Sequence, residues 1–115
     1  MRKLSDYKSK YDKLKTKKNL KGEEALKAVR KDGHALKYVQ EQTKEICLAA
    51  VRKNGFALRY VKDQTEEICL EAVRKHGYAL QYVHEQTEEI CLEAVRECVY
   101  ALEYVQENMF VEEEK

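Results

Sequence analysis

Hydrophobic and polar residues follow one another along this chain in a pattern that recurs every 22 residues. Segments that begin at Thr43, Thr65 and Thr87 align without a gap, and a less regular copy begins near Gly22. A fixed period in this range is typical of repeat proteins, in which each unit buries its apolar face against the next unit. We therefore predict an all-α fold, a short α-solenoid of four 22-residue helix–turn–helix repeats over residues 22–108.

Each unit opens with the signals of an α-helix. In the third unit Thr65 can cap the helix through its hydroxyl, and two glutamates follow in the first turn, where negative charge favours the helix dipole. One face is apolar and consists of Ile68, Cys69, Ala72 and Val73. Gly77 follows the last turn, so we predict that it ends this helix in the left-handed conformation.

A second short helix is predicted to follow the glycine, with Ala79, Leu80 and Val83 facing the core and Tyr82 beside them. The alternative is one continuous helix with a right-handed supercoil, because 22 residues make six turns at about 3.67 residues per turn. Three interior glycines would each cost such a helix about 1 kcal/mol relative to alanine. They favour the stacked hairpins.

The two ends of the chain differ from the repeats. Residues 1–21 carry nine Lys or Arg and two Asp, and the spacing of four apolar residues predicts a basic amphipathic capping helix: Leu4, Tyr7, Tyr11 and Leu14. In the last unit Val99 stands where the others have glycine. Residues 109–115 are predicted to close the core with Met109-Phe110-Val111 and to end in an acidic tail.

The net charge of +1 hides a gradient along the chain. Counting Lys and Arg against Asp and Glu, residues 1–21 carry +7, the four units carry 0, +3, −2 and −5, and the tail carries −2. A single repeat position changes in the order Lys37, Arg59, Gln81, Glu103. Surface charge therefore varies while the apolar pattern stays constant.

Residues 67–83 of the third unit read Glu-Ile-Cys-Leu-Glu-Ala-Val-Arg-Lys-His-Gly-Tyr-Ala-Leu-Gln-Tyr-Val. This segment resembles the repeat of the domain-of-unknown-function family numbered 4116, which occurs in bacteria and viruses, often in tandem copies. The resemblance covers residues 22–108 and supports the helical-repeat architecture. It implies no chemistry. An array of this kind would fit a phage or pathogen protein that binds and inhibits a host or defence component.

Neither the cysteines nor the histidines form a pattern typical of a metal or catalytic site. Cys47, Cys69 and Cys91 share one repeat position on the apolar face, where free cysteine packs as a small hydrophobe. A structural zinc site needs closely spaced ligands, which are absent, and Cys91 and Cys98 are too far apart along a helix for a disulfide. His34 and His76 occupy positions where other units have different residues. We expect no cofactor, no metal and no enzymatic activity.

The candidate binding residues are basic or aromatic. Phosphates or an acidic protein surface would be contacted by Lys8, Lys10, Lys13, Lys15, Lys17, Lys18, Arg30, Lys31, Arg52, Lys53, Arg59, Arg74 and Lys75. The alternative for the cations at helix ends is a solvated role that only complements the helix dipole. The aromatic candidates are Tyr38, Tyr60, Tyr82 and Tyr104, which either pack between units or line a binding surface.

Two functions fit these features. The first is a protein or nucleoprotein partner bound by the repeat surface, and the second is RNA or DNA bound by the basic N-terminal half. Self-association through the oppositely charged ends is a third. The longest apolar run is six residues, Ile46–Val51, which is too short for a signal peptide or a membrane span. We therefore expect a cytoplasmic protein.

Overall fold

The computed structural model describes residues 20–109 and contains eight short helices in that range. Each unit holds one α-helix followed by one 3-10 helix, written η. In chain order these are α2 (Gly22–Lys31), η2 (Gly33–Tyr38), α3 (Lys44–Lys53), η3 (Gly55–Tyr60), α4 (Glu66–Lys75), η4 (Gly77–Tyr82), α5 (Glu88–Glu97) and η5 (Val99–Tyr104). The prediction of an all-α repeat fold is confirmed, and the single-helix alternative is wrong.

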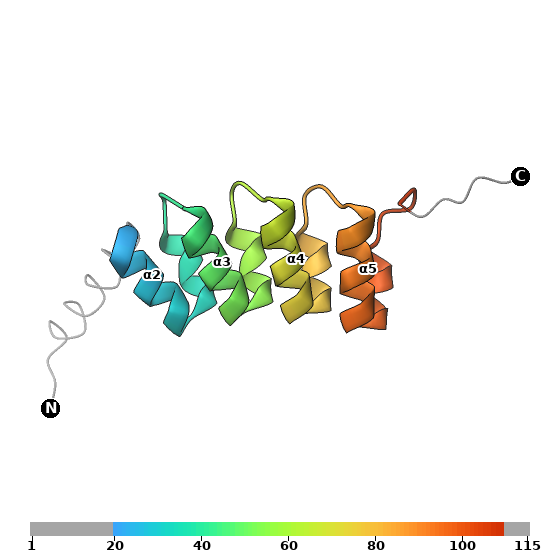
Figure 1. Ribbon diagram of the computed structural model, residues 1–115, viewed down its shortest axis with the longest axis horizontal. Coiled ribbons are helices and arrows are strands. Elements are labelled where there is room, and N and C mark those ends of the chain that lie inside the picture. Colours follow the sequence, from blue (N-terminus) through green and yellow to red (C-terminus); the bar gives the residue numbers. More distant parts are fainter. Residues whose placement is uncertain (1–19, 110–115) are drawn as a thin grey trace, which may run out of the picture.

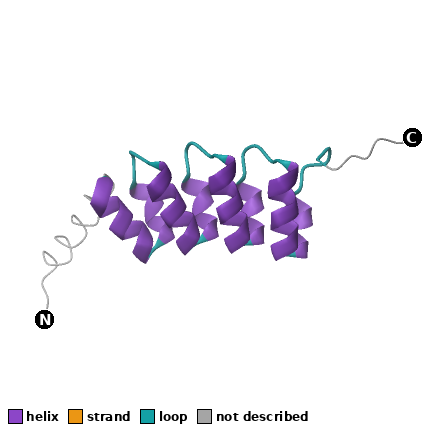
Figure 2. Cartoon of the chain, in the orientation of Figure 1, coloured by secondary structure: helices purple, strands orange, loops and turns teal. Residues whose placement is uncertain are grey.

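The units stack side by side, and their helices form two layers. The α-helices stand next to one another along the array, with the 3-10 helices in a second layer behind them (Figure 1). The longer loops, residues 39–43, 61–65 and 83–87, all lie along one edge of the array (Figure 2). Within residues 20–109, none of the helices has the length and apolar character needed to cross a membrane.

The threonine caps form as predicted. The hydroxyl oxygens of Thr43, Thr65 and Thr87 each accept a hydrogen bond from the backbone N–H three residues later, at 3.2 Å. This bond satisfies one of the donors that a helix leaves unpaired at its start. Lys21 holds the same position in the first unit and provides no side-chain cap, which fits the irregular sequence of that unit.

The glycines do not end the α-helices in the left-handed conformation, so that prediction is wrong. Among the described residues only Gly22 has a positive φ. Each α-helix ends instead at an extended residue, such as Asn54 with φ −151° and ψ 113°, whose side chain then accepts a hydrogen bond from Phe56 N–H.

The glycines are needed because neighbouring units approach closely. A Cβ atom on Gly33, Gly55 or Gly77 would lie 2.5, 2.4 or 2.6 Å from a backbone carbonyl oxygen of the following α-helix. In the final unit Val99 holds this position and is 57% exposed, since no further described unit packs on it. The position therefore requires glycine only where another unit follows.

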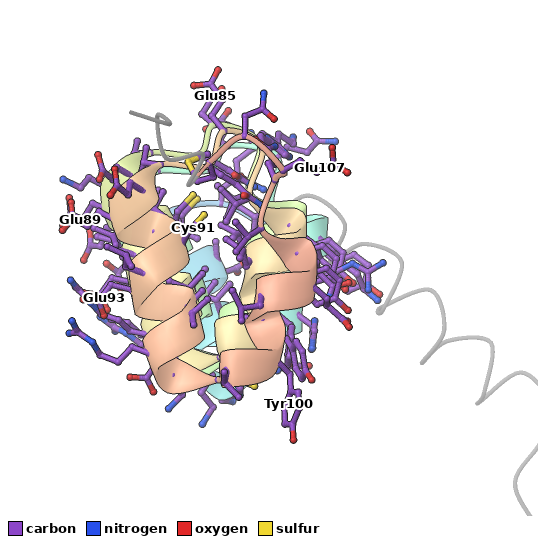
Figure 3. All side chains as sticks on the ribbon, turned by 90° about the vertical axis from the view of Figure 1, so that its right-hand side faces the viewer. Glu85, Glu89, Cys91, Glu93, Tyr100 and Glu107 are labelled. Carbon is purple, nitrogen blue, oxygen red and sulfur yellow. The ribbon has the colours of Figure 1, made fainter. Side chains whose placement is uncertain are left out.

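The core lies between the two layers and repeats from unit to unit. Figure 3 looks along the array and shows Cys91 pointing between α5 and η5, while Glu89 and Glu93 point outward. Side chains with less than 2% exposure include Leu36, Leu58, Ile68, Leu80 and Ile90. The inward positions predicted for Ala79, Leu80 and Val83 are confirmed, since all three are buried.

The two ends of the array are described only in part. The predicted capping helix, residues 1–21, lies outside the described residues except for Leu20 and Lys21. Leu20 is buried and its N–H donates to the Tyr38 carbonyl at 3.2 Å. At the other end Met109 packs against the core, while the predicted contacts of Phe110 and Val111 lie outside the described residues.

Candidate interaction surfaces

A glutamine side chain joins each unit to the next, a role that the sequence analysis missed. Gln64 Nε2 donates to the Tyr82 carbonyl at 2.8 Å, and its Oε1 accepts from His84 N–H at 2.9 Å and from Cys69 Sγ at 3.5 Å. Gln42 and Gln86 make the equivalent three bonds to the units that follow them.

Most of the partners of these glutamines are backbone atoms, which do not change when the side chain at the partner position differs between units. The glutamines can therefore hold every junction in the same geometry. A signal for them was available. Gln42, Gln64 and Gln86 recur 22 residues apart, each directly before a capping threonine. In the first unit Leu20 stands at this position and uses its own N–H to reach the Tyr38 carbonyl.

The cysteines belong to this scaffold and not to a reactive site. Burial raises the pKa of the Cys47 and Cys69 thiols to about 11, with smaller contributions from the charges of Asp63 and Glu66 respectively. Burial also raises the pKa of Cys91. Because the thiolate is the nucleophilic form, these three thiols are poor nucleophiles near neutral pH.

The other polar features of the described residues also carry no obvious chemistry. A hollow of about 420 Å³ lies at the loop edge between the third and fourth units, and it is lined by Cys69, His84, Glu85 and seven further residues. Among the residues that the structure describes, no three His, Cys, Asp or Glu side chains gather closely enough to hold a metal ion.

His76 has a structural role at an interface between units. Its Nδ1 accepts a hydrogen bond from Gly55 N–H at 3.0 Å, and its ring stacks on Phe56 with centroids 4.6 Å apart. Burial, and then the positive charge of Lys75, lower the pKa of His76. A neutral ring is required, since protonated histidine cannot accept at Nδ1.

The predicted basic residues fall on different parts of the molecule. Lys8, Lys10, Lys13, Lys15, Lys17 and Lys18 lie outside the described residues. The last turns of α2, α3 and α4 expose the row Arg30, Lys31, Arg52, Lys53, Arg74 and Lys75. Arg59 is on η3, in the other layer, and is not part of this row.

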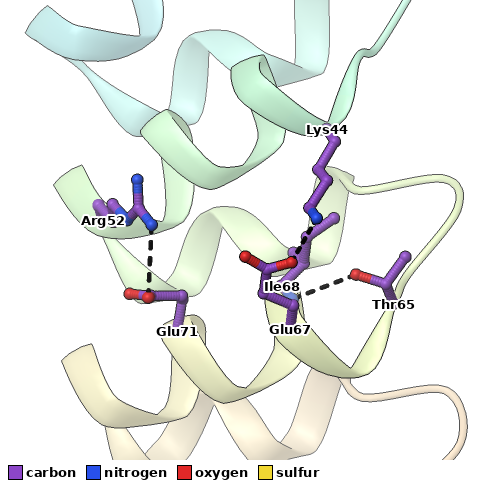
Figure 4. A network of polar contacts seen from close by, with 6 residues as sticks. All are labelled: Lys44, Arg52, Thr65, Glu67, Ile68 and Glu71. Carbon is purple, nitrogen blue, oxygen red and sulfur yellow. Dashed lines mark hydrogen bonds and ion pairs between the residues drawn. The ribbon is translucent and has the colours of Figure 1, made fainter.

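Ion pairs between α-helices compensate part of the arginine row. Arg52 lies 3.5 Å from Glu71 of α4, and Arg74 lies 3.5 Å from Glu93 of α5. Lys44 pairs with Glu67 beside the Thr65 cap, as Figure 4 shows together with the Arg52–Glu71 pair. The arginines at the α3–α4 and α4–α5 junctions are therefore compensated more fully than Arg30 at the α2–α3 junction.

The predicted tyrosine row, Tyr38, Tyr60, Tyr82 and Tyr104, lies along the 3-10 layer and is half-buried. Three of these rings pack edge to face on an aromatic ring of the preceding unit, in the pairs His34–Tyr60, Phe56–Tyr82 and Tyr78–Tyr104. The row thus contributes both to packing between units and to the surface.

Cations cover the tyrosine row at its N-terminal end. Lys37 Nζ lies 5.0 Å from the centroid of the Tyr38 ring, and Arg59 Cζ lies 5.3 and 5.4 Å from the centroids of Tyr60 and Tyr82. Such distances are within the range of cation–π attraction. At the same position the later units have Gln81 and Glu103, so the row changes from basic to acidic along its length.

Comparison with known proteins agrees with the repeat architecture. The sequence profile of one family, described as Domain of unknown function (DUF4116), matches residues 23–64 and again residues 65–110. Each match spans about two of the 22-residue units. Neither the comparison with curated proteins nor the comparison with solved structures found a match. Because the two matched segments cover most of the sequence, the chain belongs to the family described as Domain of unknown function (DUF4116).

Proposed function

We propose that this chain is a non-enzymatic interaction module that binds a protein partner along its tyrosine row. The observation that carries the proposal is the change of charge over a constant scaffold. The rings recur in every unit, while the residue beside them changes in the order Lys37, Arg59, Gln81, Glu103. A surface that only stabilised the fold would have no need of this order.

The change in charge favours protein over nucleic acid as the partner. The backbone of a nucleic acid carries negative charge along its whole length, so the two C-terminal units, which carry −2 and −5, would repel it. A protein can instead present acidic groups to one end of the row and basic groups to the other.

The tyrosine rings also suit a protein interface. Tyrosine is enriched among the residues that contribute most to binding, because it combines a large apolar ring with a polar hydroxyl. The edge-to-face contacts hold Tyr60, Tyr82 and Tyr104 before any partner arrives. Side chains that are already ordered lose little conformational entropy on binding.

The test is capture of partners by the full chain and by two matched charge variants. One variant carries Lys37→Glu and Arg59→Glu on the tyrosine row, and the other carries Lys21→Glu and Lys62→Glu at exposed positions outside the helices and outside the tyrosine row. Both change the net charge equally. Captured protein and RNA are measured by mass spectrometry and sequencing, with and without nuclease, at about 50 mM salt, where screening is weak.

We expect a protein that is retained after nuclease treatment, is lost from the tyrosine-row variant and is kept by the Lys21→Glu/Lys62→Glu variant. Equal loss from both variants would mean that only net charge matters, and retention that disappears with nuclease would refute a direct protein contact.

RNA or DNA binding by the N-terminal half is the second candidate. It is favoured by the charge of +3 in residues 43–64 and by Arg59, whose guanidinium lies over two tyrosine rings. Binding of labelled single-stranded RNA that is tight at about 50 mM salt and falls steeply as salt is raised would support this candidate. Absence of RNA binding at micromolar protein concentration would exclude this candidate.

A further inference from the structure

A hollow of about 390 Å³ opens between α2 and α3 on the outer α-helical face, opposite the tyrosine row. Its lining consists of Leu26, Arg30, Glu45, Ala49, Arg52 and Lys53. Leu26 is buried and Ala49 is half-buried, so the floor is apolar, while the three cations are exposed. Cationic groups outnumber the single carboxylate in this lining.

The corresponding position in the next two junctions holds a glutamate. Between α3 and α4, Glu71 approaches Arg52, and between α4 and α5, Glu93 approaches Arg74 (Figure 4 shows the first pair). Ala49 stands 22 residues before Glu71 and offers Arg30 no carboxylate.

One side chain accounts for the difference between this junction and the α3–α4 junction. Twenty-two residues after Leu26, Arg30, Glu45, Arg52 and Lys53, the chain has Leu48, Arg52, Glu67, Arg74 and Lys75, which are the same residue types. The hollow is therefore the site of the Arg–Glu pair of the later junctions, with the glutamate replaced by alanine.

We propose that this hollow binds an acidic side chain of a partner protein, whose carboxylate takes the place that Glu71 and Glu93 hold in the later junctions. The guanidinium of Arg30 can bind a carboxylate through two parallel hydrogen bonds. Leu26 and Ala49 provide an apolar floor for the methylene groups of a glutamate. The inference rests on the proposed protein-binding function and names the chemistry of the partner at a second surface.

The lining favours a protein carboxylate over a phosphate. The carboxylates that fill the equivalent positions in this chain are glutamate side chains of neighbouring helices. An acidic segment of a protein presents the same group.

Two substitutions test the site in opposite directions. Ala49→Glu supplies the missing carboxylate from within the chain and should close the hollow. Glu71→Ala should open a second hollow between α3 and α4 with an equivalent lining. Both positions lie partly exposed on the outer face of their helices, and circular dichroism of each variant verifies that it is folded.

The probe is an acetylated hexaglutamate peptide, titrated into the ¹⁵N-labelled full chain and followed by nuclear magnetic resonance, with hexaglutamine as the neutral control. Backbone amides of α2 and α3 and the Arg30 Nε–H report on this site separately from the lysine-rich residues 1–19. We expect saturable shifts at the backbone amides around position 49 and at Arg30, and an affinity that falls by up to about fivefold in Ala49→Glu, as expected for loss of a surface Arg–carboxylate contact. Glu71→Ala should add new shifts around position 71.

Unchanged affinity in Ala49→Glu, or no new site in Glu71→Ala, would overturn the proposal. Inorganic phosphate that produces the same shifts at lower concentration than hexaglutamate would replace it with a phosphate site. The capture experiment with the tyrosine-row variants does not involve this hollow, so failure of the hollow and failure of the protein-binding function are distinguishable.

Discussion

Substitution of Gly55 by alanine tests the structural reason for the repeated glycines. The added Cβ would lie 2.4 Å from the Ala72 carbonyl oxygen and 3.0 Å from Nδ1 of His76, whereas ordinary contacts begin near 3.4 Å. Both atoms belong to the third unit. The second and third units would therefore have to separate by about 1 Å, and closely packed interfaces do not absorb such a shift without loss of contacts.

The expected magnitude follows from three contributions. Overpacking of a close interface costs about 1–3 kcal/mol. Loss of the hydrogen bond between Gly55 N–H and His76 Nδ1 adds about 0.5–1.5 kcal/mol. Replacing glycine also reduces the entropy of the unfolded chain, which offsets about 0.4–1 kcal/mol. We expect Gly55→Ala to lower the free energy of unfolding by about 2 kcal/mol.

The measurement is urea unfolding followed by far-ultraviolet circular dichroism, with Val99→Ala as the matched control. Val99 holds the same repeat position at the free end of the described array, so this variant should change stability by less than about 0.5 kcal/mol. Equal stability of the two variants would refute the argument from close approach.

Three further predictions concern the scaffold. Gln64→Ala removes the hydrogen bonds that join two units, and we expect urea unfolding to show a free energy of unfolding lower by about 2 kcal/mol. The control Gln40→Ala, at an exposed position, should lower it by less than about 0.5 kcal/mol. Similar losses in the two variants would argue against the role of Gln64. Of the four cysteines only Cys98 is not buried, so one thiol of the native protein should react with Ellman's reagent and none should react in Cys98→Ser. Early reaction of a further thiol would contradict the burial of the other three cysteines. Because the folded state lowers the pKa of His76, its contribution to stability is complete above the ordinary value of 6.5 and is lost as pH falls below it towards the lowered folded-state pKa. Urea unfolding of the wild type and of His76→Asn at several pH values should show this loss only in the wild type, and the same pH dependence in both would assign it to other groups.

The fold could be predicted from the sequence because its signals are local and repeated. A threonine followed by glutamates, an apolar face and a terminal Arg-Lys pair specify an α-helix by contacts within a few residues. Four copies of that pattern, 22 residues apart and less regular in the first and last units, leave little choice but stacking, since one unit cannot bury its own apolar face.

The reason for the glycines could not be predicted in this way. Glycine has two uses, a left-handed backbone and close approach of another chain segment, and sequence alone does not separate them. In this molecule the carbonyl of Ala72 decides the matter at Gly55, and that atom comes from the next unit. Val99 was the available signal, because a backbone requirement would have applied to the last unit as well.

The candidate surfaces divide along the same line. By itself, the sequence determined the helices, the 22-residue register, the basic-to-acidic gradient and the spacing of the tyrosines, because each is a property of order along the chain. Only the tertiary structure decided which layer each residue occupies: Arg30 and Arg52 line a hollow between α-helices, while Arg59 lies over rings on the opposite layer. The physical reason is that the Arg52–Glu71 ion pair, the contact of Arg59 with Tyr82 and the hydrogen bond from Gln64 to the Tyr82 carbonyl each join residues about one repeat apart. Their geometry exists only after the units have stacked.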